Sequence, residues 1–144
     1  MAGFGDHKKS KHKIKKNLKK NHFKEEIIQN AFKFHAEGNF LEAIKFYKSF
    51  INQGFEDKTV FYNFGILLIG LGKLKEAELS LRKAIELEPH YAIAHSNLGG
   101  ILKDLGRSKE AELSLRKAIE LDPNIANAHM NLGGILKDLG RSKE

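Results

Sequence analysis

Apolar residues recur along residues 24–144 at the three- and four-residue spacings of helices. Phe61, Phe64 and Leu68 share one face of a predicted first helix. Ala77, Leu81 and Ala84 form a small–large–small stripe that can receive it from the next helix. The pattern predicts pairs of amphipathic helices. Each first helix is followed by a glycine expected in the left-handed conformation, at Gly38, Gly72, Gly106 and Gly140.

This pattern repeats almost letter for letter. EAELSLRKAIELEP at Glu76–Pro89 returns 34 residues later, at Glu110–Pro123, as EAELSLRKAIELDP, and Asn97–Glu110 is copied unchanged at Asn131–Glu144. A fixed period of this length is typical of arrays in which each repeat is one helix pair packed against its neighbours. We divide the chain into an arm and four repeats: 1–23, then 24–57, 58–91, 92–125 and 126–144, the last holding a first helix and the start of a second.

The repeats resemble the tetratricopeptide repeat family, which prefers set residue types at eight positions. The third repeat has His95, Leu98, Gly99, Leu102, Ala111, Leu115, Ala118 and Pro123 there. The second has Phe61, Phe64, Gly65, Leu68, Ala77, Leu81, Ala84 and Pro89. The first is looser, with Ile27, Asn30, Ala31, Phe34, Ala43, Tyr47, Phe50 and Phe55. The resemblance implies an all-α fold, a right-handed α-solenoid of antiparallel helix pairs.

The resemblance also implies that the first helices line a concave groove that binds ligands. One groove row would hold Gln29, Asn63, Asn97 and Asn131. A carboxamide both donates and accepts hydrogen bonds, so this row could hold a peptide backbone; it is similar to the asparagine ladder of O-linked N-acetylglucosamine transferases. The alternative is that these asparagines pack or cap neighbouring repeats. The candidate groove residues are Gln29, Phe32, Tyr62, Asn63, Ile66, Asn97, Lys103, Asp104, Asn127, Asn131, Lys137 and Asp138.

One subclass of the family grips the C-terminal carboxylate of heat-shock chaperones with Lys and Asn at set groove positions. Ile28, Phe32 and Ile93 stand at those positions here. The sequence therefore disfavours a chaperone adaptor.

The leading functional hypothesis is a protein-interaction scaffold that binds an extended peptide in the groove. The alternative is the N-terminal, substrate-recruiting region of a larger glycosyl-, sulfo- or methyltransferase. It rests on the resemblance and on an array that stops inside a repeat at Glu144, as in a truncated chain. The stop would leave Leu132, Ile135 and Leu136 without a covering helix. The alternative to a truncated chain is a natural stop at this point, whose uncovered edge could self-associate.

Charge is concentrated at the N-terminus. Residues 1–24 hold nine lysines and one aspartate, a net charge of +8, and the whole chain carries +7, so the remainder carries −1. Residues 1–23 also contain few large apolar side chains, and this composition predicts a disordered arm. Its lysines could attract nucleic acid non-specifically, although the interleaved aromatic residues of a dedicated single-strand binder are absent. A functional basic patch stays open as an alternative.

No catalytic, cofactor or metal site is predicted. The absence of cysteine excludes disulfides, thiolate zinc sites and thiol nucleophiles. His95 and His129 share one repeat position and should lie too far apart for one ion. Gly99–Ser108 has the wrong spacing for a phosphate loop, with Arg107 where lysine is required. The carboxylates should lie on solvated faces, including outward pairs of Glu78 with Arg82 and Glu112 with Arg116.

The longest apolar run, Phe64–Leu71, is too short for a membrane helix. The lysine-rich start is not followed by the apolar segment of a secretory signal. We therefore expect no membrane insertion and a cytoplasmic location.

Overall fold

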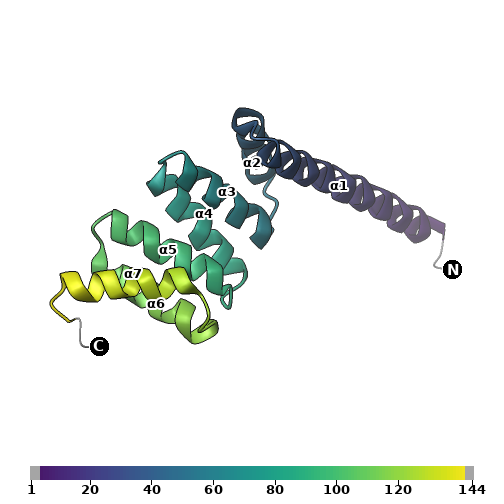
Figure 1. Ribbon diagram of the computed structural model, residues 1–144. Coiled ribbons are helices and arrows are strands. Elements are labelled where there is room, and N and C mark those ends of the chain that lie inside the picture. Colours follow the sequence, from purple (N-terminus) through teal and green to yellow (C-terminus); the bar gives the residue numbers. More distant parts are fainter. Residues whose placement is uncertain (1–3, 142–144) are drawn as a thin grey trace. The chain divides into compact units, whose positions relative to one another are not determined.

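The computed structural model describes residues 4–141, which form seven helices and no strands (Figure 1). The helices are α1 (Phe4–Ala36), α2 (Phe40–Asn52), α3 (Lys58–Gly70), α4 (Leu74–Leu87), α5 (Ala92–Asp104), α6 (Ser108–Leu121) and α7 (Ala126–Asp138). The chain divides into two compact units, one ending at Phe55 and one beginning at Glu56, and each is described by itself.

The first unit packs α1 against α2 through aromatic side chains. The ring centroids of Phe34 in α1 and Phe46 in α2 lie 5.6 Å apart, and that of Phe50 in α2 lies 5.5 Å from that of Phe55, which follows α2. Tyr47 has no exposed surface. A buried phenol needs a hydrogen-bond partner, and the Tyr47 hydroxyl finds one in His35 Nδ1 at 2.9 Å.

Residues 4–23, predicted to be disordered, are instead helical and continuous with the packed part of α1. Every side chain from His7 to Phe23 is exposed, so no burial explains this helix. Two local causes do. The packed residues of α1 supply the costly nucleus, after which each added residue gains one hydrogen bond, and lysine is a good helix former. Residues 1–3 of the predicted arm lie outside the described residues.

The second unit stacks α3 to α7 in chain order, each helix packing on the next, with α5 also packing on α7 (Figure 1). Ala77, Leu81 and Ala84 of α4 have no exposed surface, and neither do their copies in α6, at Ala111, Leu115 and Ala118. The predicted small–large–small stripe is therefore confirmed in both helices.

Glycine lets the paired helices approach. A Cβ atom on Gly99 would lie 2.5 Å from Leu115 Cγ, and one on Gly65 would lie 3.0 Å from Leu81 Cγ. Gly133 holds the same repeat position in α7, and a Cβ there would meet no atom within 4 Å. Two identical stretches of sequence therefore occupy different environments, one under α6 and one open.

The turns within the helix pairs contain left-handed glycines, as predicted. Gly38, Gly72, Gly106 and Gly140 have φ values of 75°, 72°, 76° and 69°. The exits from the second helices differ from one another. Extended Glu88 and Asp122 precede Pro89 and Pro123 after α4 and α6, whereas Gly54, with φ of 70°, follows α2.

The prediction of an uncovered α7 was wrong for two of its three residues. Leu132 is half-buried, but Ile135 is 1% exposed and Leu136 is 7% exposed. They are covered because α7 packs on both α5 and α6. The predicted start of a further helix, at 142–144, lies outside the described residues.

Candidate functional site

Two first helices of the second unit are joined by three polar side chains, which we call the tyrosine–asparagine cluster: Tyr62, Tyr91 and Asn97. The Asn97 amide nitrogen donates a hydrogen bond to the Tyr62 hydroxyl at 3.2 Å. The ring centroids of Tyr62 and Tyr91 lie 5.1 Å apart. All three residues are half-buried. The cluster therefore connects α3 to α5 while part of its polar surface stays accessible.

The tyrosines of this cluster are neutral at pH 7. Burial raises the pKa of Tyr62, and the hydrogen bond from Asn97 offsets part of that rise. Burial also raises the pKa of Tyr91, helped by the charge that Tyr62 or Asp57 would place beside it. Neutral phenols both donate and accept hydrogen bonds. The cluster can therefore offer either role to a ligand.

Between α5 and α7, long polar side chains lie over glycines. Asn131 Nδ2 is 3.5 Å from the point that a Cβ of Gly100 would occupy, and Lys103 Nζ is 3.3 Å from that of Gly134. Glycine at these positions makes room for the side chain of the adjacent helix. The corresponding residue of α3 is Ile66, so this row changes from a large apolar side chain on α3 to glycines on α5 and α7, over which polar side chains lie.

The other candidate residues fall into three groups. Asn63 and Ile66 of α3 are half-buried, like Lys103 and Asn131. Gln29 and Phe32 belong to the first unit; Gln29 is exposed, and the Phe32 ring centroid lies 6.4 Å from that of Tyr47. The exposed candidates of the second unit are Asp104 of α5 and Asn127, Lys137 and Asp138 of α7.

Tyr91 was missed by the sequence analysis, as was the bond between Tyr62 and Asn97. The signal was a separation of 35 residues between Tyr62 and Asn97, one more than the repeat. Such a separation places the two residues diagonally on adjacent first helices. The bond shows that Asn97 takes part in joining α3 to α5, as the packing alternative for the asparagine row expects.

The histidines that recur at one repeat position, His95 and His129, are hydrogen-bonded to the turns that precede their helices. His95 Nε2 donates to the Pro89 carbonyl at 2.9 Å, and His129 Nε2 donates to the Pro123 carbonyl at 2.7 Å. Both bonds tie a first helix to the turn before it. Within residues 4–141, no three histidine or carboxylate side chains gather as a metal site would require.

The expectation that the Glu78 and Glu112 carboxylates face solvent was wrong. Each side chain is only 13% exposed, because an arginine from the next repeat covers it. Arg107 contacts Glu78 at 2.8 Å and Glu110 at 2.6 Å, and Arg141 contacts Glu112 at 3.0 Å. The predicted pairs of Glu78 with Arg82 and Glu112 with Arg116 are present at 2.8 and 2.9 Å. We call this set the arginine–glutamate ladder.

The ladder changes the acidity of its carboxylates. The guanidinium of Arg107 holds the pKa of Glu110 below its usual range, and Arg116 does the same for Glu112. Because the same contacts recur in consecutive repeats, we assign the ladder to the joining of repeats. None of the helices described is both long and apolar enough to cross a bilayer.

Comparison with known proteins agrees with this geometry. Residues 62–124 match the family model described as Tetratricopeptide repeat. The structure of MamA is similar, with a TM-score of 0.79 and 22% identity over 99% of this chain and 88% of that one. So is YrrB, "a TPR protein with an unusual peptide-binding site", with a TM-score of 0.74 and 24% identity over 80% of this chain and 59% of that one.

A third similar structure is the second TPR domain of human RPAP3 in complex with the HSP70 peptide SGPTIEEVD. Its TM-score is 0.68, with 25% identity over 76% of this chain and 91% of that one. No curated protein sequence matches the chain significantly. The family match over residues 62–124, the helix pairs that repeat it and the shared fold all agree with the resemblance of this chain to the tetratricopeptide repeat family.

Proposed function

We propose that the chain is a non-catalytic scaffold that binds an extended segment of a partner protein along α3, α5 and α7. The observation that carries this proposal is the recurrence of carboxamides at one position of successive first helices, at Asn63, Asn97 and Asn131. Two proteins of similar fold are described as having a peptide-binding site or a bound peptide. Their example supports peptide binding as the use of this surface.

The spacing of the row suits an extended ligand. Neighbouring packed helices lie about 8–10 Å apart, and an extended chain advances about 3.3 Å per residue. One carboxamide therefore meets the ligand about every three residues. The Asn97 nitrogen is bonded to Tyr62, so its carbonyl oxygen would accept an N–H group of the ligand backbone.

Contacts to the backbone do not select side chains, so selectivity must come from flanking residues. Exposed Asp104, Lys137 and Asp138, with half-buried Lys103, place both charge signs beside the row. Ile93 stands where a carboxylate clamp would need lysine. We therefore propose an internal segment of the partner as the ligand, in preference to its C-terminal carboxylate.

The test replaces Asn63, Asn97 and Asn131 together by alanine. Twelve-residue peptides are first selected from a random library on the unmodified chain, and their affinities are then measured by fluorescence anisotropy. The matched control replaces three exposed asparagines outside the row, Asn21, Asn52 and Asn124. Since each hydrogen bond contributes about 0.5–1.5 kcal/mol, we expect the row variant to lose at least about 10-fold in affinity. Equal affinities of the two variants would reject the proposal.

A substrate-recruiting role within a larger transferase is a second candidate for the same surface. It is favoured by the likeness of the asparagine row to the ladder of O-linked N-acetylglucosamine transferases. Both candidates use the same peptide contacts, so the asparagine test does not separate them. The coding sequence downstream of Glu144 does: a transferase domain in frame would support this candidate, and an immediate stop codon would reject it.

A further inference from the structure

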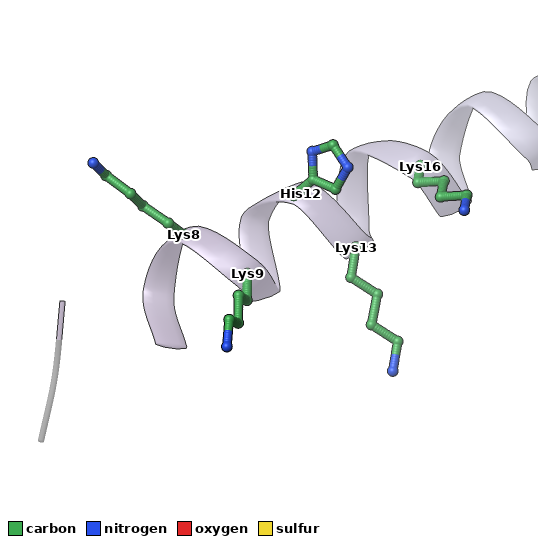
Figure 2. A pocket seen from close by; sticks show the side chains of 5 residues that line it. All are labelled: Lys8, Lys9, His12, Lys13 and Lys16. Atoms are coloured by element: carbon green, nitrogen blue, oxygen red, sulfur yellow. The ribbon is translucent and has the colours of Figure 1, made fainter. Parts of the chain in front are cut away.

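The N-terminal half of α1 carries a strongly charged surface that the proposed groove does not use. We call it the basic helix surface: Lys8, Lys9, His12, Lys13 and Lys16. Figure 2 shows these side chains projecting away from the helix, with Lys9 and Lys13 on one side and His12 on another. All five residues are exposed. The helix therefore holds these charges in fixed positions along one axis.

The density of charge is close to that of a nucleic-acid duplex. Seven lysines and no acidic residue lie between Lys8 and Lys19. At about 1.5 Å per residue this stretch rises about 17 Å, or one positive charge per about 2.4 Å. A DNA duplex carries one negative charge per about 1.7 Å of its axis. The two linear densities are similar enough for the lysines to neutralise phosphates along the length of this stretch.

The lysines furthest from the packed part of α1 are the ones available to a partner. Lys20 Nζ lies 5.7 Å from the ring centroid of Phe55, and Lys24 Nζ lies 5.8 Å from that of Phe50. Those two side chains lie against the core of the first unit. The basic helix surface precedes them along α1, where every side chain from His7 onward is exposed.

The distribution of lysines around α1 favours binding in the groove of a duplex over binding on a flat surface. At about 100° per residue, the seven lysines from Lys8 to Lys19 spread over an arc of about 200°. A helix in the major groove of a duplex has phosphates on both walls, so lysines on both of its flanks find partners.

A lipid surface instead requires a broad apolar face opposite the charges. From His7 to Asn21 the only large apolar side chains are Ile14 and Leu18, which are 57% and 62% exposed. Two side chains present too little apolar area to insert into a bilayer.

We propose that α1 binds the phosphate backbone of double-stranded nucleic acid, without sequence preference, through the basic helix surface. This binding is independent of the peptide groove, because the lysines lie on the first unit and the asparagine row that we assign to the ligand lies on the second. The contacts are ionic, so the affinity falls steeply with salt.

The experiment measures binding of the whole chain to a fluorescent 20-base-pair DNA duplex of mixed sequence between 50 and 200 mM NaCl. The test variant replaces Lys9, Lys13 and Lys16 by glutamine, which has a helix propensity close to that of lysine. The matched control replaces three exposed lysines of α2, α4 and α6, at Lys48, Lys75 and Lys109, with the same change in net charge. Circular dichroism at 222 nm checks that α1 stays helical.

We expect the test variant to bind at least about 10-fold more weakly at 50 mM salt, with its log–log salt slope reduced by about 2.7 for three lost phosphate contacts. The control should stay within about twofold of the unmodified chain. Equal losses in both variants would overturn the proposal, because net charge alone would then explain binding. Absence of duplex binding at 50 mM salt would overturn it too. So would tighter, Lys9-dependent binding to vesicles containing one quarter phosphatidylserine.

Discussion

The two units fill the same repeat positions with different side chains. The second unit sets Gly65 against Leu81 and Gly99 against Leu115. The first unit has Ala31 at the position of the two glycines and Tyr47 at that of the two leucines, and both are buried. The comparison teaches that the repeat specifies a small residue on one helix facing a large one on the next. The identity of the two residues can change as long as this small-on-large pattern is kept.

The polar interactions of the two units differ as well. In the first, the half-buried histidine His35 is hydrogen-bonded to the buried tyrosine Tyr47. In the second, the arginine–glutamate ladder runs along the surface from one repeat to the next. Ile44 holds the position of Glu78 in the first repeat, so the ladder residue is absent there. The two units should therefore respond differently to packing changes, to pH and to salt.

The largest expected effect comes from adding one methyl group to the second unit, with Gly99→Ala. Its Cβ would lie 2.5 Å from Leu115 Cγ, so the pair must separate at a cost of about 1–3 kcal/mol in unfolding free energy. The matched control is Gly133→Ala, at the same repeat position with open space around it. There alanine should stabilise the helix by about 0.5–1 kcal/mol. Urea denaturation measures both, and effects of the same sign would contradict the close-packing explanation.

A smaller effect is expected on the pH dependence of stability, which should differ between the two units. Burial lowers the pKa of His35 below its ordinary value of 6.5. The unfolded chain therefore takes up a proton at this residue more readily than the folded one, so the first unit loses stability as pH falls through about 6.5. Hydrogen exchange should show faster opening of α2 at pH 5.5 than at pH 7.5, after correction for intrinsic exchange rates. His35→Leu should remove most of this pH dependence, and an unchanged dependence would exclude His35 as its source.

The smallest effect is expected at the ladder. Arg107→Gln should lower the melting temperature of the second unit slightly at low salt and not at all in 1 M NaCl, because exposed ion pairs are screened. The pKa of Glu110 is lowered by Arg107, so this contribution is present above the ordinary glutamate range and is lost as pH falls through the folded value. Lys73→Gln is the matched control, since Lys73 directly precedes α4 and contacts Glu76 in the first turn of that helix, at 3.6 Å. A loss that persists in 1 M NaCl would point to packing in place of charge.

Helical periodicity predicted most of the fold. It identified the buried stripe of α4 and α6, the close approach at Gly65 and Gly99, and the left-handed glycines. These features depend only on which residues share a face of one helix, and a single sequence contains that information.

The features that the sequence did not reveal depend on how helices pack on one another or on the continuation of one helix into the next segment. To predict that Ile135 and Leu136 are buried, one must know that α7 packs on two helices at once. To predict that the Glu78 side chain is shielded from solvent, one must know where the long side chain of Arg107 lies. Helix formation before residue 24 depends on the packed residues that follow and not on local composition. In the candidate site, the row of asparagines was visible in the sequence, but the bond between Asn97 and Tyr62 was not.

The letter-for-letter copy of Asn97–Glu110 at Asn131–Glu144 has a consequence for how such a chain can change its length. A duplication or deletion of 34 residues by unequal recombination joins surfaces that already fit one another, so the new junction needs no compensating mutation. The array can then lengthen or shorten by whole repeats, and each step would add or remove one asparagine of the row. The reach of the groove along a partner would evolve in discrete increments while the local chemistry of each contact stays the same.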